Sequence, residues 1–385
     1  MKSEIVNKPL APPQGGCGDA AAVQNAQCAR RETWVDSLKG FVIILVVFGH
    51  VVQRLRVAAV AGGSENAGLL QAVEASIYAF HMPLFFLISG FVFAMAYFDK
   101  SGRLRREKVW WQVANLFLLY LIFAALFAVY LFFSQPQFVY NLGGYTSFGQ
   151  FLLSVLYLPL GEYWYLYDLC IAYVLFVVGV RFVSSEVLLV LSCILAVVVA
   201  PFSDIFVVKA PGYAFFDIPR LVTIQLPFFF LGVVIFSARL KLSQWVSLCT
   251  LVVAVTLFVL SHYSPLSSVR AFTWGANRAA ALGLSLFFFD LFRRVRLLDC
   301  NVLRVCGEFS LVIYLFHFAA LKVANVVVAH MGIQALVPVV IVKTIVATAL
   351  PLLLAVVLQR VGLYRHLFRP ANTVGALVGR LRSKA

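Results

Sequence analysis

Charged residues are scarce in this chain. They make up 12% of its 385 residues, against about 25% in a typical soluble domain. Hydrophobic residues make up 62%, and this combination is typical of a protein that lies mostly within lipid. The composition therefore predicts an all-α polytopic membrane protein that forms a single membrane domain.

Cysteine ligand patterns and targeting signals are also absent. The seven cysteines show no CxxC or comparable spacing, which predicts neither a metal site nor a disulfide framework. No apolar segment precedes Leu38, so the start of the chain does not resemble a signal peptide. Residues 1–29 are rich in proline, glycine, alanine and glutamine. We therefore predict that they form a disordered cytoplasmic tail.

Long apolar segments fill most of the remaining chain. About ten of them are long enough to cross a membrane, which predicts about ten transmembrane helices. The predicted spans are 38–54, 75–98, 111–134, 163–182, 186–202, 219–238, 244–262, 272–292, 308–329 and 336–359.

Basic residues gather on one side of this predicted topology. That side contains the loop after the second span and the end of the chain, whereas the other side holds only Arg54, Arg56, Lys209, Arg220 and Arg270. The positive-inside rule then places both termini in the cytoplasm and the protein in the inner, cytoplasmic membrane. We predict a membrane domain over residues 30–369 and a basic cytoplasmic tail over 370–385. The same bias explains the net charge of +15 without a nucleic-acid partner.

The first predicted helix carries three polar residues with a regular spacing. Eleven positions separate Lys39 from His50, which is close to three helical turns, so both side chains lie on one face. His50 then lies about 16 Å further along the helix, near the middle of the membrane. A histidine at that depth is costly unless it is paired or lines a polar cavity. Asp36, one turn before Lys39, is positioned to pair with it.

These residues belong to a run, DSLKGFVIILVVFGH (36–50), that resembles the opening helix of the acyltransferase-3 family of integral membrane acyltransferases. FHMPLFFLISGFVF (80–93) resembles the second-helix signature of that family, and is most similar to its fucose-4-O-acetylase-like branch. The basic loop that follows matches the family's RxxR pattern at Arg103 and Arg106. Weaker similarity occurs at YWYLYDL (163–169), LPFFFLGVVI (226–235) and EFSLVIYLFHF (308–318).

The resemblance implies transfer of an acyl group, usually acetyl, from acyl-CoA to a hydroxyl, usually of a carbohydrate or lipid-linked glycan. His50 is the candidate general base, because a neutral imidazole accepts a proton near pH 7. The alternatives are a transient acyl-histidine, which the sequence does not separate from the general-base route, and a histidine that only packs between helices. Lys39 and Asp36 are candidates at the cytoplasmic mouth, where the alternative is an ordinary ion pair. Arg103 and Arg106 are the candidate ligands for the phosphates of coenzyme A, and the alternative is a topogenic role alone.

Further polar residues are candidates for acceptor binding. His81 either faces His50 across a cavity or bonds to carbonyls freed by Pro83. Glu162 and Trp164 offer an acid beside an aromatic ring, which suits a sugar, although an interfacial aromatic belt explains them equally simply. The remaining intramembrane candidates are His317, for which a structural role is favoured, and Arg278 and Lys343, either of which can instead pair with an acid such as Asp290.

A second class of function fits the same intramembrane charges. A transporter or glycan flippase would use them as its pathway. The absence of an evident inverted-repeat pair of broken helices disfavours that interpretation. We therefore predict a membrane O-acyltransferase that holds no permanently bound cofactor, uses acyl-CoA as its donor and contacts membrane lipid; its oligomeric state is not predicted.

Overall fold

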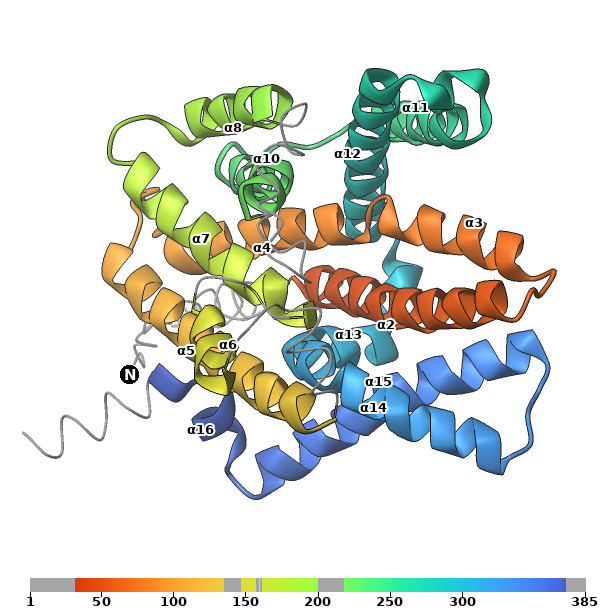
Figure 1. Ribbon diagram of the computed structural model, residues 1–385. Helices are drawn as coiled ribbons and strands as arrows, with labels where there is room; N and C mark the ends of the chain where they lie inside the picture. The colour runs from red at the N-terminus through yellow and green to blue at the C-terminus, as the bar shows by residue number, and fades with distance from the viewer. Residues whose placement is uncertain (1–31, 135–146, 157–158, 160, 200–217, 372–385) are drawn as a thin grey trace, which may run out of the picture.

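The computed structural model describes residues 32–134, 147–156, 159, 161–199 and 218–371, and over these ranges the chain is helical, with no β-strand. The all-α prediction is therefore confirmed. The predictions for residues 1–29 and for most of residues 370–385 concern segments outside the residues that the structure describes. The helices, labelled in Figure 1, are α2 (Thr33–Ala61), α3 (Ala67–Tyr78), α4 (His81–Tyr97), α5 (Arg106–Ser134), α6 (Phe148–Ser154), α7 (Trp164–Gly179), α8 (Ser185–Val199), α10 (Ile218–Ser237), α11 (Gln244–Tyr263), α12 (Arg270–Arg294), α13 (Asn301–Glu308), α14 (Ser310–His330), α15 (Leu336–Arg360) and α16 (Tyr364–Phe368).

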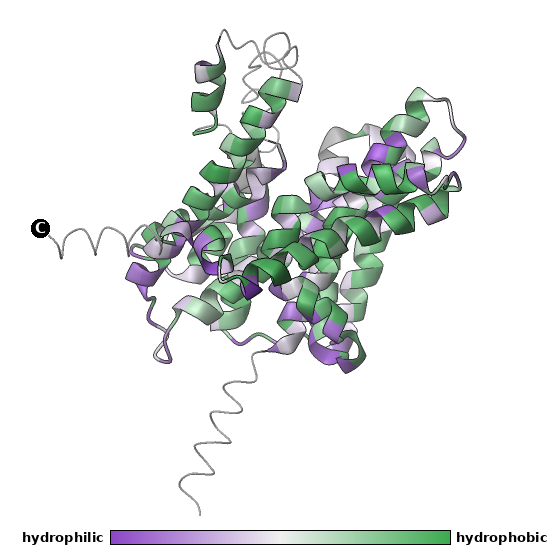
Figure 2. Cartoon of the chain, turned by 90° about the horizontal axis from the view of Figure 1, so that it is seen from below, coloured by the Kyte–Doolittle hydropathy of each residue, from purple (hydrophilic) through white to green (hydrophobic). Residues whose placement is uncertain are grey.

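Within the described ranges, seven helical segments are long and apolar enough to cross a membrane. The predicted number of ten spans is not confirmed. Two of the predicted segments form shorter apolar helices, Ser185–Val198 and Ile224–Ser237, and a third, α12, carries Arg278 and Asp290 among its apolar residues. Hydrophobic residues, drawn in green, still make up most of the helices in Figure 2. The chain is a multi-pass membrane protein.

The predicted second span is interrupted in the structure. It is divided at Ala79 and Phe80 into α3 and α4. The predicted ninth span coincides with α14, and only its first two residues, Glu308 and Phe309, precede that helix. Hydropathy alone could not locate the break in the second span, because that segment remains apolar through it. The break matters for function, since it places Tyr78 and His81 beside His50 on α2.

Glycine pairs allow two helix contacts that no larger residue would permit. A Cβ atom on Gly307 would lie 1.7 Å from the carbonyl oxygen of Asp36, and one on Gly40 would lie 1.9 Å from that of Leu303. Gly90 and Gly232 make the same kind of approach between α4 and α10. Backbones this close gain packing contacts that membrane helices otherwise lack. The first pair fixes α2, and with it His50, against α13.

A carboxylate at the same end of the bundle strengthens the α2–α13 contact. Asp299 accepts hydrogen bonds from the hydroxyls of Thr33 (2.6 Å) and Ser37 (2.7 Å) in the first turns of α2. Arg304 on α13 donates to both oxygens of the same carboxylate, at 2.7 and 2.8 Å. The hydrogen bonds from Arg304, followed by those from the hydroxyls, hold the pKa of Asp299 well below its usual range.

Candidate active site

His50 lies at the centre of a polar group inside the helix bundle. Its Nε2 is 3.4 Å from a carboxylate oxygen of Glu162, and only 12% of its side chain is exposed. Its Nδ1 is 3.2 Å from the hydroxyl of Tyr78 and 3.3 Å from the side-chain oxygen of Gln53. The buried histidine is therefore paired, as the cost of placing it inside a membrane requires.

Glu162 reaches His50 because of the turn that precedes α7. Gly161 has a φ of +56°, a conformation that glycine adopts most readily. Glu162 lies in the single 3₁₀ turn that follows, and its carbonyl accepts a hydrogen bond from the Tyr314 hydroxyl on α14. Sequence spacing could not reveal the contact with His50, because more than a hundred residues lie between the two side chains.

The contacts of His50 indicate which ring nitrogen can act as a base. A carboxylate can only accept a hydrogen bond, so Glu162 favours the tautomer that carries its proton on Nε2. Nδ1 then holds the lone pair. The Tyr78 hydroxyl donates to it, and the Gln53 amide donates as well once its oxygen and nitrogen are exchanged by a flip of that group. A substrate hydroxyl that replaced Tyr78 at this nitrogen would be positioned to give up its proton.

The other two intramembrane histidines are held by backbone carbonyls. Nδ1 of His81 lies 2.8 Å from the carbonyl oxygen of Ile77, and Nδ1 of His317 lies 2.6 Å from that of Tyr314. Each Nδ1 must therefore carry the proton. The carbonyl that His81 contacts belongs to Ile77, on α3 before the helix break. The rings of His317 and His50 are stacked with centroids 5.2 Å apart, so His317 supports the face of the candidate base.

These side chains border a cavity of about 340 Å³, which we call the His50 cavity. Small-molecule sites in proteins begin at about this size. Besides His50 it is lined by Tyr78, His81, Glu162, Trp164, Gln225 and Arg278. The structure therefore brings together His50 and the three predicted acceptor-binding residues, His81, Glu162 and Trp164. Arg278 adds a positive charge that the sequence did not assign to this place, and Asp290 pairs with Arg294 at 2.6 Å.

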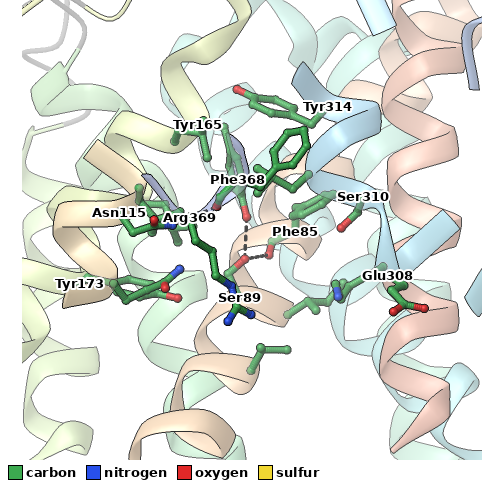
Figure 3. A pocket seen from close by; sticks show the side chains of 18 of the residues that line it. Phe85, Ser89, Asn115, Tyr165, Tyr173, Glu308, Ser310, Tyr314, Phe368 and Arg369 are labelled. Atoms are coloured by element: carbon green, nitrogen blue, oxygen red, sulfur yellow. Dashed lines mark hydrogen bonds between the residues drawn. The ribbon is translucent and has the colours of Figure 1, made fainter. Parts of the chain in front are cut away.

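A second cavity, of about 300 Å³, lies further toward the end of the bundle that contains Thr33 and Arg360. We call it the Lys39 cavity. Figure 3 shows it from close by, with the Arg369 side chain reaching toward its centre. Lys39 borders this cavity and pairs with Asp36 at 3.1 Å. Lys39 and His50 thus line two separate cavities along one helix face.

Tyr314 lines both cavities and stands between them. Its ring lies 5.5 Å from that of Tyr165, whose hydroxyl is 2.7 Å from the Ser89 hydroxyl. Ser89 also donates to the Phe85 carbonyl, as the dashed lines in Figure 3 show. The hydroxyl proton of Ser89 is therefore donated within its own helix, and the Tyr165 hydroxyl donates to Ser89. The rings of Tyr314 and Tyr165, which we call the aromatic layer, form the barrier between the two cavities.

Arg103 and Arg106 are exposed and line neither cavity. They follow a tight turn in which Asp99 accepts hydrogen bonds from the Ser101 hydroxyl and the Arg103 backbone; these bonds hold the Asp99 pKa below its usual range. The backbone N–H of Arg105 donates to the carbonyl of Tyr97, and Tyr97 interacts electrostatically with Arg369. The loop that carries the two arginines is therefore connected through Tyr97 to Arg369, which lines the Lys39 cavity.

Sequence analysis did not identify Arg369 as a site residue. It enters the Lys39 cavity because Asn115 on α5 donates to the carbonyl of Phe368 and accepts from the backbone of Ala371, at 3.2 and 3.4 Å. Both neighbours are buried, so this segment packs against the bundle. Arg369 lies among other basic residues near the end of the chain, and in the sequence it therefore resembled a residue that only keeps that end in the cytoplasm. Tyr314 carried a weak signal, three residues before His317.

Comparison with known proteins agrees with this architecture. The described helices form a membrane bundle in which a paired histidine lines one of two cavities. The sequence profile of the acyltransferase 3 family, described as an acyltransferase domain, matches residues 32–358, so the chain belongs to that family. No curated protein and no solved structure matches the chain.

Proposed function

We propose that this membrane acyltransferase moves an acyl group, acetyl in the first instance, from acyl-CoA to a hydroxyl of a carbohydrate or lipid-linked glycan. The observation that supports it best is the His50–Glu162 pair, which lies in one of two cavities separated by Tyr314. The resemblance of residues 80–93 to the fucose-4-O-acetylase-like branch supports a sugar hydroxyl as the acceptor.

The donor enters from the cytoplasm in this proposal. Both termini and the basic loop after α4 lie on the cytoplasmic side of the inner membrane, according to the distribution of Lys and Arg. The pantetheine arm would occupy the Lys39 cavity, and its acyl group would pass beside Tyr314 into the His50 cavity. Arg369 and Lys39 line the Lys39 cavity. Arg103 and Arg106, in the loop connected to Arg369 through Tyr97, would hold the phosphates, since guanidinium groups suit phosphate oxygens.

The chemistry then takes place beside Tyr314. Nδ1 of His50 accepts the proton of the acceptor hydroxyl while the hydroxyl oxygen attacks the thioester carbonyl. The carbon–sulfur bond breaks, and the leaving thiolate takes the proton from the imidazolium. Glu162 stabilises the imidazolium between these two transfers. Arg278, on the same cavity, is suited to stabilise the negative charge that develops on the carbonyl oxygen.

Replacing His50 tests this assignment. We expect His50→Gln to lower acyl transfer by about 10²–10⁴-fold, because glutamine keeps a polar side chain but cannot accept a proton. Its affinity for acetyl-CoA in detergent should stay within about twofold, since His50 does not line the Lys39 cavity. The measurements are glycan acylation in cells by mass spectrometry and binding of labelled acetyl-CoA to the purified protein.

His317→Gln is the matched control, because His317 is stacked on His50 but is bonded through its own Nδ1 to the backbone. Near-normal acylation by His50→Gln would refute the proposed base. A transporter or flippase, the rival function, would require sealed vesicles and would release no CoA. Gradient-independent release of CoA by the protein in detergent therefore distinguishes the two classes.

A further inference from the structure

Three basic side chains lie at one level near the His50 cavity. Arg54 is seven residues before the end of α2, Lys322 is eight before the end of α14, and Lys343 is seven after the start of α15. These helices contact one another, and Figure 1 shows their corresponding ends on the same side of the bundle. Each residue is therefore about 10–12 Å from that end.

Arg54 connects this group to the candidate base. Its guanidinium carbon is 4.7 Å from the centre of the Phe318 ring, and the same ring is 4.9 Å from that of His50. The positive charge and the imidazole therefore contact the same aromatic ring, one turn apart on α2. Arg54 also interacts electrostatically with Glu162, the partner of His50.

Lys322 and Lys343 approach Arg54 from the neighbouring helices. The Lys322 ammonium donates to the hydroxyl of Tyr130 and lies 3.7 Å from the centre of its ring. Tyr130 interacts electrostatically with Arg54, and so does Lys343. Three positive charges from α2, α14 and α15 therefore share one region beside the His50 cavity.

Little negative charge compensates this group. In the described part of the chain, neither Lys322 nor Lys343 forms an ion pair with a carboxylate, and the acid coupled to Arg54 is Glu162, which is shared with His50. Arg56 provides the contrast: two residues further along α2, it forms an ion pair with Glu74. Lysines within a membrane are costly and are retained mainly where they act. Like charges held together also repel, and a bound anion would relieve that repulsion.

We propose that Arg54, Lys322 and Lys343 bind an anionic group of the acceptor, a phosphate or a carboxylate, while its hydroxyl lies at Nδ1 of His50. The proposal deepens the proposed function, on which it rests, by naming the acceptor as an acidic glycan or a glycan on a lipid phosphate. Arg54 and His50 are one turn apart on α2 and contact the same ring of Phe318, so the anion and the acylated hydroxyl belong to the same or to adjacent sugar units.

The test uses the full-length protein in nanodiscs of zwitterionic phosphatidylcholine. Radiolabelled glucose 1-phosphate, glucuronate and neutral glucose serve as soluble probes, and phosphatidylglycerol in the disc serves as the lipid probe. We expect the wild type to bind at least one of the two anionic sugars at least tenfold more tightly than glucose. The variant R54Q/K322Q/K343Q should lose that preference. Arg56→Gln, whose arginine is already paired, should retain it.

The source of the anion and the two proposals are tested separately. Preference for glucose 1-phosphate indicates a lipid-linked or glycosyl phosphate, and preference for glucuronate an acidic sugar. Equal binding of all three sugars, an unchanged preference in the triple variant, or an effect of phosphatidylglycerol alone would overturn the inference. Acetyl-CoA binding and His50-dependent CoA release are measured on the same samples. If the wild type neither binds acetyl-CoA nor releases CoA but still prefers the anionic sugars, the proposed function is refuted and the anion site is retained.

Discussion

Replacing Glu162 by glutamine tests how the candidate base is activated. The carboxylate lies 3.4 Å from Nε2 of His50. At that distance, a unit charge and an imidazolium attract each other by about 5 kcal/mol with an effective dielectric constant near 20. The Glu162 side chain is 34% exposed, and solvent screening reduces this energy. We take about half of it, 2–3 kcal/mol, as the stabilisation of the imidazolium that forms during transfer.

A loss of that size corresponds to a fall of about 30- to 150-fold in the rate of acyl transfer. The effect should appear in kcat, because the imidazolium is present only after the proton has moved. Acetyl-CoA affinity should not change, since Glu162 does not line the Lys39 cavity. The assay is release of CoA thiol by the purified protein, with envelope glycan as acceptor. Glu162→Asp retains the charge at a longer distance and should recover part of the rate.

Glu74→Gln is the control, because that carboxylate is on the same side of the bundle but is paired with Arg56. We expect it to change the rate by less than about fivefold, as for a compensated charge. A Glu162→Gln protein with the kcat of the wild type would show that His50 needs no carboxylate, and the orientation argument from Nε2 would fail. An equal loss in both variants would indicate a general electrostatic effect instead.

Two further changes test the barrier and the α2 anchor. Tyr314→Ala should join the two cavities and admit water, so that acceptor-independent hydrolysis of acetyl-CoA rises severalfold relative to transfer. Tyr314→Phe keeps the ring and should not raise hydrolysis. Equal hydrolysis in both variants would refute the barrier role. Asp299→Asn should lower the stability of the protein in detergent at pH 7 by about 1–3 kcal/mol, measured by thermal unfolding. Because the Asp299 pKa is depressed in the folded state, its contribution is present above the usual carboxyl pKa and is lost as the pH falls below about 4. The wild type should therefore lose more stability than Asp299→Asn on acidification through that range, and parallel losses would contradict the anchor.

The sequence predicted those features that depend on composition and local spacing. An apolar chain with few charges must be a helical membrane protein, and the eleven-residue spacing was enough to place Lys39 and His50 on one face. The number of spans was less predictable, because the apolar helices Ser185–Val198 and Ile224–Ser237 are short and α12 contains charges. The break between α3 and α4 left no hydropathy signal, although it brings Tyr78 to His50.

The site required information that no local pattern carries. Glu162 was a candidate for binding sugar because it lies near Trp164, yet in the structure its carboxylate pairs with His50. Arg369 and Tyr314 acquire their positions from contacts between segments far apart in sequence, through Asn115 in one case and Glu162 in the other. Long-range contacts of this kind follow from packing, and a single sequence does not specify them in a readable form.

The arrangement of charge along α2 joins these observations into one mechanism. Lys39, His50 and Arg54 follow one another along the helix, lining the Lys39 cavity, lining the His50 cavity and contacting Phe318, respectively. A donor with several phosphates and an anionic acceptor would each meet a positive charge at its own end of the helix. The neutral imidazole lies between them, where a proton must be exchanged and where a permanent charge would bind one substrate too tightly to release it. In the proposed function a single helix would therefore align both substrates, and its glycine contact with α13, which leaves no space for even one methyl group, holds that helix in position.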